Sequence, residues 1–433
     1  MKLEIAKGTR DFSPKEEMLR QNVINKLRKV FQLYGFSPIE TPLLERYEVL
    51  SAKFTAGEES DAMKEVFTLT DQGGRKLGLR YELTFPLARY IGMNPQIRLP
   101  FKRYQIGRVY RDGPIKLGRY REFWQCDVDI AGCDKLIADA EIVSILQRGF
   151  KELGLDVSIE VNNRVLLNDI LAFAGVEKEK QEGVLITLDK LKKVAKEGVK
   201  EELQSKSIDA GIIEKILDVL SVTGSNSEKL DSIKEKIGET KGIKETREFL
   251  SYINDFNVDV EFCPSLVRGL AYYTGPIFEV FLKDSEITSS VAAGGRWDNM
   301  IGSFLGTDAI TPATGVAFGL EPITEELKRR EILTKECVTD IFVIPIGDTA
   351  KKCVEIIQQL RENNVSCDMD FLKKGISKNL DYANKMNIPF VILVGEDELK
   401  AGKLKLKNMS SGEESLVSIS EVIRKMKGEK NEQ

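Results

Sequence analysis

One run of the chain, from Leu266 to Phe281, combines residue types that could hold an anionic group beside a flat, polar-edged surface. Two adjacent tyrosines, Tyr272 and Tyr273, follow shortly after Arg268, and an alternating apolar run comes next. A guanidinium group binds a carboxylate or a phosphate through paired hydrogen bonds, and the phenol rings add a flat wall. The run therefore predicts a site for a small planar amino acid. A surface arginine before a buried aromatic strand would give the same pattern, so other segments must decide.

Arginines also bracket a glycine-bearing loop between two alternating runs, Phe101–Tyr110 and Arg121–Gly132, which we expect to be antiparallel strands. Arg111 follows the first run, and Arg119 closely precedes the second. This arrangement could fork around a triphosphate while Phe123 or a neighbouring ring stacks on a base. A basic hairpin exposed to solvent is the alternative.

Polar side chains line one face of the second expected strand. Gln125, Asp127 and Asp129 share this face, because successive side chains of a strand point to opposite sides. Burying such a row without a ligand or partner is costly. With arginines at both ends of the preceding loop, the row favours a binding site over an exposed hairpin.

The composition excludes several kinds of chemistry. The 433 residues contain no histidine, which rules out a Ser-His-Asp triad, a histidine general base and a histidine metal ligand. The six cysteines show no Cys-x-x-Cys spacing, so we expect neither a zinc site nor a disulfide framework. Any reaction must use arginine, lysine, carboxylates, tyrosine, backbone amides or the phosphates of a substrate.

Charge and hydropathy predict a cytoplasmic protein that binds neither membranes nor DNA. The amino terminus lacks an apolar signal core, and no segment approaches the roughly 18 uninterrupted apolar residues of a membrane helix. A formal net charge of −4 predicts no strong nonspecific binding to nucleic acid, but it does not exclude a local basic groove for RNA.

The periodicity predicts two regions that contain strands, of which the first is interrupted. A Lys/Glu-rich, helix-patterned block from about 163 to 256 separates the strands of residues 1–332. Beyond residue 338, strands and helices alternate, which favours a small parallel or mixed sheet covered by helices. The other expected elements are, in order, a helix capped by Ser13, strand Phe36–Thr41, hairpin Phe67–Arg80, helices Glu82–Ile91 and Asp134–Leu153, strands Val157–Val161, Val258–Phe262, Ile277–Leu282 and Ser289–Ala293, and helix Pro322–Glu331.

Together these segments resemble the class II aminoacyl-tRNA synthetases, in the form found in histidyl-tRNA synthetases. Arg111–Gly132 is similar to motif 2 of this family, and Leu266–Gly275 to its histidine-binding signature. Phe36–Pro42 looks like motif 1, which forms the dimer, and Leu79–Thr84 looks like the segment that holds the substrate's amino group. The resemblance covers nearly the whole chain, and the run Arg-Gly-Leu-x-Tyr-Tyr-Thr-Gly is its most specific part.

The resemblance implies an α+β fold with two domains. Residues 1–332 would form an antiparallel-sheet class II catalytic domain with a helical insertion at about 163–256, and residues 338–433 an α/β anticodon-binding domain. It also implies a homodimeric ligase that uses ATP and Mg²⁺ to attach L-histidine to tRNA(His) through a histidyl-adenylate. This chemistry suits a chain without histidine, because an ionised carboxylate attacks the α-phosphate without a general base and needs only alignment and charge neutralisation.

Carried over residue by residue, the resemblance implies two sets of site residues and no metal ligand. Those for the amino acid would bind the α-ammonium (Glu82 and Thr84, with Gln125 nearby), bond the imidazole nitrogens (Asp129 and Tyr273) and wall the pocket (Tyr272). Those for ATP would grip the α-phosphate (Arg111), hold the triphosphate (Arg119), and bridge the substrate carboxylate to the α-phosphate (Arg268). Arg268 and Arg111 would be the catalytic residues.

Two positions depart from the family pattern. Pro322 stands where motif 3 usually carries an arginine that contacts the γ-phosphate, and proline cannot bind phosphate. Lys328, Arg329 or an arginine of motif 2 could substitute, and we expect Arg119 to do so. Ala271 replaces an acidic residue found in many relatives.

The missing arginine leaves other functions open. A noncatalytic relative of the family, the regulatory subunit of ATP phosphoribosyltransferase, binds histidine as a signal. The well-formed α/β region Ile341–Met426 argues against such a regulator, which has no evident need for it. A generic nucleotide-binding transferase would leave the two adjacent tyrosines unexplained.

Overall fold

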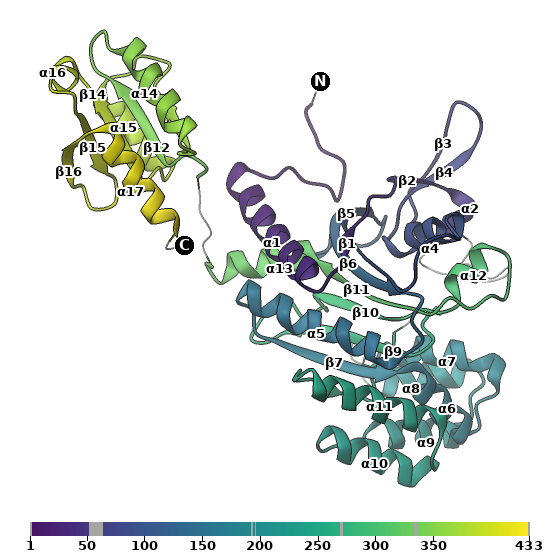
Figure 1. The fold of residues 1–433 in the computed structure, drawn as a ribbon. Helices are drawn as coiled ribbons and strands as arrows, with labels where there is room; N and C mark the ends of the chain where they lie inside the picture. The colour runs from purple at the N-terminus through teal and green to yellow at the C-terminus, as the bar shows by residue number, and fades with distance from the viewer. Residues whose placement is uncertain are drawn as a thin grey trace. The chain divides into compact units, whose positions relative to one another are not determined.

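The computed structural model describes residues 2–51, 64–191, 194, 196–268, 272–332 and 337–431. The chain divides into two compact units (Figure 1). The larger unit contains most of the chain up to Ile332, and the smaller unit contains the carboxy-terminal part together with Phe12–Leu19. Among the helices in these ranges, none is long and apolar enough to cross a bilayer.

An eight-stranded sheet forms the centre of the larger unit, in the order β1-β5-β6-β11-β10-β9-β7-β8. Its strands are β1 (Ser37–Pro38), β5 (Phe101–Tyr110), β6 (Glu122–Ala131), β7 (Val157–Asn163), β8 (Glu261–Phe262), β9 (Pro276–Leu282), β10 (Ala292–Arg296) and β11 (Ala313–Gly319). Neighbours run antiparallel except at the two edges, where β1 pairs with β5 and β8 pairs with β7 in parallel. The predicted antiparallel α+β fold is thus confirmed.

Aromatic side chains join helices α1 (Pro14–Leu33) and α5 (Leu136–Leu153) to the apolar face of this sheet. The ring of Phe31 lies 5.7 Å from that of Tyr104 on β5, and the ring of Phe150 lies 5.4 Å from that of Phe318 on β11. Since side chains alternate along β5 and β6, the opposite face carries the polar residues of these strands. The sequence predicted both helices.

Smaller elements flank the sheet. A three-stranded sheet contains β2 (Leu44–Arg46), β3 (Thr68–Thr70) and β4 (Lys76–Leu79), so the expected hairpin around residue 72 is present. The remaining helices among the described residues of this part are α2 (Tyr47–Ser51), α4 (Thr84–Met93), α12 (Met300–Phe304) and α13 (Leu320–Arg329).

The block between β7 and β8 is helical, as predicted (Figure 1). It contains α6 (Arg164–Ala174), the short η1 (Lys178–Lys180), α7 (Gln181–Leu188), α8 (Lys196–Ser205), α9 (Ala210–Leu220), α10 (Asn226–Ile237) and α11 (Lys241–Asp255). Its apolar core continues into Leu266, Tyr273 and Ile277 of the strand-rich part. The block therefore packs directly behind one of the candidate tyrosines.

The smaller unit holds a five-stranded mixed sheet in the order β13-β12-β14-β15-β16. The strands are β12 (Ile341–Pro345), β13 (Cys367–Met369), β14 (Phe390–Val394), β15 (Leu404–Asn408) and β16 (Glu414–Val417). The helices are α14 (Ala350–Glu362), α15 (Ile376–Lys385), α16 (Glu396–Lys400) and α17 (Ile419–Asn431). The first three strands are parallel and the last two join antiparallel, which confirms the predicted mixed sheet.

Three predicted strands differ from the structure. The expected strand Ser289–Ala293 lies later, as β10, and includes the glycine pair at 294 and 295. The reason is a close approach, because a Cβ atom at Gly294 would lie 2.0 Å from the carbonyl oxygen of Gly315 on the neighbouring strand. The edge strands β1 and β8 are each only two residues long, shorter than the alternating runs predicted.

Candidate active site

Arg103 joins the polar face of β6 to the segment that begins α4. Arg103 lies on β5, opposite Asp129 of β6. Its Nη2 atom is 2.7 Å from the Oδ2 atom of Asp129. The Nη2 atom also donates a hydrogen bond of 3.3 Å to the carbonyl oxygen of Leu83, the residue between Glu82 and Thr84. Two segments predicted to hold different ends of the amino acid are thus brought together by one buried cation.

Asp129 is only 3% exposed and lies against a glycine. Gly315 is its neighbour on β11, where a Cβ atom would lie 2.0 Å from the Oδ1 atom of Asp129. Burial raises the pKa of Asp129 to about 6, although Arg103 opposes this change. The carboxylate can therefore occupy its place only because residue 315 has no side chain.

The two tyrosines lie in tilted contact with each other, and both interact with the charge of Glu82. The ring centroids of Tyr272 and Tyr273 are 4.5 Å apart, and the Tyr272 hydroxyl donates a 3.4 Å hydrogen bond to that of Tyr273. A Cβ atom at Gly295 would lie 2.8 Å from the Tyr273 ring. Burial raises the pKa of Tyr272 well above its ordinary value, and the charge of Glu82 adds to this effect. Glu82 and the tyrosines therefore share one pocket.

Arg268 is held at the same pocket by a partner that the sequence analysis did not identify. Its Nη1 atom donates a 2.7 Å hydrogen bond to the Oε1 atom of Glu279 on β9. Its guanidinium carbon lies 5.3 Å from the centre of the Tyr273 ring. The sequence did contain a signal for this ion pair, because the acidic Glu279 lies on the strand that follows Arg268.

The residues expected at the α-ammonium present buried oxygen atoms. Within the described ranges, the Oε1 atoms of Glu82 and Gln125 are buried and have no hydrogen-bond partner. Thr84 is half-buried and is the first residue of α4. Unpaired buried acceptors are costly, so such oxygens are suited to a ligand that donates hydrogen bonds.

The two candidate arginines of the loop between β5 and β6 have different surroundings. Arg111 donates a 3.2 Å hydrogen bond to the carbonyl oxygen of Tyr81, and its guanidinium carbon lies 4.2 Å from the Tyr81 ring and 5.2 Å from the Phe123 ring. Arg119 is exposed, and its backbone pairs with that of Lys116 in the loop. The structure thus brings Arg111 to the pocket but leaves Arg119 on the loop surface.

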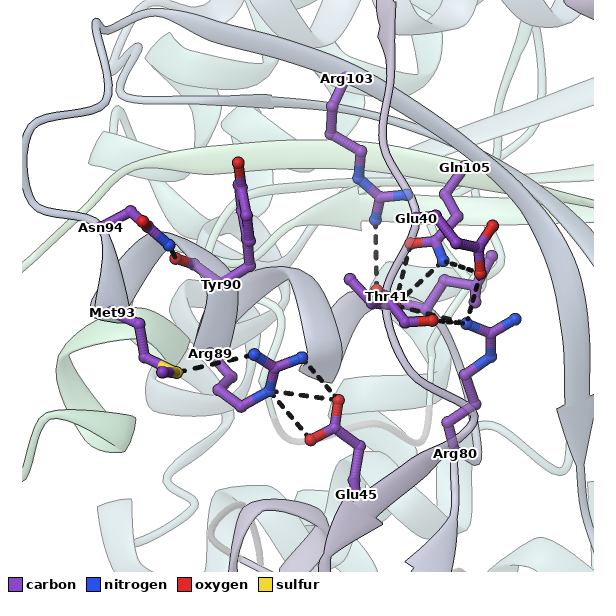
Figure 2. A network of polar contacts seen from close by, with 11 residues as sticks. Glu40, Thr41, Glu45, Arg80, Arg89, Tyr90, Met93, Asn94, Arg103 and Gln105 are labelled. Carbon is purple, nitrogen blue, oxygen red and sulfur yellow. Dashed lines mark hydrogen bonds and ion pairs between the residues drawn. The ribbon is translucent and has the colours of Figure 1, made fainter.

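A buried network holds the segment that carries Glu82 (Figure 2). Arg80 donates 2.7 Å hydrogen bonds to the carbonyl oxygens of Thr41 and Arg108, which lie beside β1 and on β5. Figure 2 shows Arg80, Thr41 and Gln105 linked beside Glu40. Arg80 is 1% exposed, and a Cβ atom at Gly107 would lie 2.4 Å from its Nη2 atom. This arginine therefore fixes the backbone two residues before Glu82.

The candidate pocket combines residues from most of the segments singled out in the sequence, and one family model covers all of the segments that form it. The model described as histidyl-tRNA synthetase matches residues 8–323, and an anticodon-binding-domain model matches residues 340–429. The chain belongs to the histidyl-tRNA synthetase family.

Curated relatives and solved structures agree with this assignment. A "Histidine--tRNA ligase 1" of Bacillus cereus (strain ATCC 10987 / NRS 248) is 41% identical over 97% of this chain and 96% of its own length. A "Histidine--tRNA ligase 2" of Shouchella clausii is 41% identical over 96% of this chain and 98% of its own. The structure of histidyl-tRNA synthetase from Nostoc sp. PCC 7120 matches with a TM-score of 0.86 at 28% identity, covering 99% of this chain and 100% of that chain.

One structural match bears a double title. A chain from Bacillus halodurans C, titled "ATP phosphoribosyltransferase regulatory subunit/histidyl-tRNA synthetase", has a TM-score of 0.75 and covers 91% of this chain and 98% of that chain. Its sequence identity is 22%, so this match supports the shared fold alone.

The motif 3 region of this synthetase-family chain has a structural role. Glu321, which is 1% exposed, lies 2.9 Å from Arg20 of α1 and accepts a 2.9 Å hydrogen bond from the backbone N–H of Trp124 on β6. Pro322 follows in the first turn of α13. A Cβ atom at Gly118, in the motif 2 loop, would lie 3.2 Å from the Cα atom of Pro322. The loop therefore approaches the residue that replaces the arginine.

The cations suggested as substitutes on α13 already have acidic neighbours on that helix. Lys328 lies 3.8 Å from Glu325, and Arg329 lies 2.7 Å from Glu326. Such pairs make both side chains poorer candidates for a triphosphate than the exposed Arg119. The second departure, Ala271, lies outside the described residues.

Proposed function

We propose that this protein attaches L-histidine to tRNA(His) in two steps, by forming histidyl-adenylate from histidine and ATP and then transferring the histidyl group to the tRNA. The observation that carries the proposal is the pocket in which Asp129, Glu82, the two adjacent tyrosines and Arg268 meet. Few ligands other than a small amino acid with a polar flat ring combine an anionic end, a cationic end and N–H donors at this scale.

In the first step, the pocket orients histidine at both ends. Glu82 and Thr84, with Gln125, bind the α-ammonium, while Asp129 and Tyr273 bond the imidazole nitrogens and Tyr272 forms the wall. An ionised carboxylate can only accept hydrogen bonds, so Asp129 in its ionised form selects a ring that carries an N–H donor. The buried ion pair with Arg103 holds that carboxylate in place.

The arginines bring the reacting groups together. Arg268 bridges the histidine carboxylate and the α-phosphate of ATP, with Arg111 gripping the α-phosphate from the other side and Arg119 holding the triphosphate. Alignment and neutralised charge account for the rate enhancement, because the attacking carboxylate is already ionised. Glu279 keeps the Arg268 guanidinium oriented toward Tyr273 before substrates bind.

Mg²⁺ would neutralise charge on the triphosphate. Among the described residues, no group of three or more acidic or cysteine side chains could hold a metal ion by itself. A magnesium ion commonly binds through substrate phosphates and water with one or two carboxylates. We therefore propose that Mg²⁺ binds mainly through the triphosphate of ATP.

The remaining expectations form part of the same proposal. Residues 1–332 are the catalytic domain with its insertion at about 163–256, and residues 338–433 bind the anticodon of tRNA rather than DNA. The protein acts in the cytoplasm as a homodimer formed through motif 1. The side chains of Leu43 and Leu44, directly after motif 1, are 42% and 45% exposed, which supports a subunit contact at this segment.

Because Pro322 stands in place of the motif 3 arginine, one other function must be tested, that of a histidine-binding regulatory protein without catalysis. Histidine-dependent exchange of labelled pyrophosphate into ATP separates the two functions, with an Arg268→Ala variant as control. We expect exchange in the wild type and none in the variant. Histidine binding without exchange in the wild type would leave only the regulatory function.

A further inference from the structure

Asp127 is a buried carboxylate on the polar face of β6 with no role in the proposal above. It is 3% exposed and lies on β6 between Gln125 and Asp129, on the same face of the strand. Its neighbours across the sheet are Gln105 on β5 and the apolar Ala317 on β11. Neither neighbour is a cation.

The charged groups that act on Asp127 come from three segments. Arg103 and Arg111 are positive, while Asp129 and Glu82 are negative. Arg103 already makes the ion pair with Asp129, and Arg111 donates to a backbone carbonyl. Three carboxyl groups therefore share two guanidinium groups.

Two carboxylate oxygens in this cluster lack a partner. Over the ranges that the structure describes, neither Asp127 Oδ1 nor Glu82 Oε1 has a hydrogen-bond partner, and both residues are more than nine-tenths buried. A native structure rarely leaves such atoms unpaired without a ligand. Unpaired carboxylate oxygens of this kind suit a ligand that donates hydrogen bonds.

We infer that Asp127 is a further binding residue of the histidine subsite, where it faces the α-ammonium together with Glu82. The inference rests on the proposed function, because it takes histidine as the ligand. An ammonium group supplies three N–H donors and one positive charge, which matches the unpaired oxygens and the excess of carboxyl groups.

A change of protonation follows from this arrangement. Burial, opposed by Arg103 and Arg111 but reinforced by Asp129 and Glu82, holds the pKa of Asp127 well above its usual range. Without a ligand, Asp127 keeps its proton at pH values where an exposed aspartate has lost it. The ammonium of histidine favours the ionised form, so binding releases a proton from Asp127 to the buffer.

The test is calorimetry of histidine binding at several pH values above the usual range of an aspartate, each in two buffers of different ionisation enthalpy, which counts the protons released. We expect the wild type to release protons, and Asp127→Asn to release fewer while its histidine Kd rises roughly ten- to hundredfold. The Kd for ATP should change by less than about threefold, since the lost contact faces histidine alone. Glu326→Gln is the control, because it also replaces a buried carboxylate by an amide but lies outside the pocket, where it pairs with Arg329.

A ligand comparison keeps the inference testable if the variant does not fold. Imidazolelactate has a hydroxyl in place of the α-ammonium, so its binding to the wild type should release fewer protons than histidine binding. Equal proton release by both ligands, or unchanged histidine affinity in Asp127→Asn, overturns the inference. If Asp127→Asn lowers only the melting temperature, Asp127 is a structural counter-charge of Arg103 and the inference is wrong. Failure of the wild type to form an adenylate would instead refute the proposed function itself.

Discussion

Replacing Asp129 by asparagine should separate recognition of the imidazole from stability of the fold. The lost charge-assisted hydrogen bond contributes about 1.5–3 kcal/mol, so the histidine KM should rise about ten- to hundredfold while the ATP KM stays nearly constant. The change also leaves the buried Arg103 without its 2.7 Å partner. Breaking such a pair costs about 3–5 kcal/mol, so we expect a markedly lower unfolding free energy.

A double variant, Arg103→Met with Asp129→Asn, distinguishes these two effects. It removes the unpaired cation, so urea unfolding should show that most of the lost stability returns. Pyrophosphate exchange at varied histidine concentration should still show the raised KM, because the imidazole ligand is absent. If the double variant regained both stability and the wild-type histidine KM, the defect would come from the buried arginine and Asp129 would not contact the substrate.

Three further predictions test other parts of the pocket. Arg119→Ala should raise the ATP KM about tenfold through loss of a phosphate contact, as measured by pyrophosphate exchange at varied ATP concentration. An unchanged ATP KM would contradict the role of Arg119 as the substitute for the missing motif 3 arginine. Gly315→Ala should abolish measurable histidine binding by calorimetry, since the added Cβ atom would lie 2.0 Å from the Asp129 carboxylate, whereas Gly183→Ala, with open space at its Cβ position, should bind normally. Because burial raises the pKa of Asp139 to about 6, the folded protein holds more protons than the unfolded chain between about pH 4 and pH 6. The unfolding free energy should therefore fall as pH rises through that window, by up to about 3 kcal/mol from this group, and urea titrations of Asp139→Asn should show a flatter pH dependence.

Local patterns were sufficient to predict most elements of the fold. The alternation in β5 and β6 and the apolar period of α1 can be recognised from consecutive residues. The predicted bounds of these three elements therefore agree with the structure within one or two positions. The shift of β10 could not be foreseen, because glycine is a poor strand former in isolation. Its place in the sheet depends on the close approach of Gly315, which lies on a strand many residues away.

The candidate site divides in the same way. Motif residues such as Arg268 and Asp129 could be singled out by type and spacing, but their partners Glu279 and Arg103 lie on neighbouring strands. Naming a partner requires the register between strands, and register depends on the whole sheet. Arg80 was part of a recognised segment, yet its structural role depends on two backbone carbonyls that no local pattern identifies.

The contacts around Pro322 explain why the start of α13 stays packed although the usual motif 3 arginine is absent. Glu321, next to it, is fully engaged by Arg20 and by the Trp124 backbone, so the start of α13 joins α1 to β6. Gly118 adopts a φ of +70°, and a Cβ atom there would make a tight contact of 3.2 Å with the Cα atom of Pro322. The loop that carries Arg119 is thus packed onto the position that lost its cation, and phosphate recognition by the loop itself is the arrangement that this packing favours.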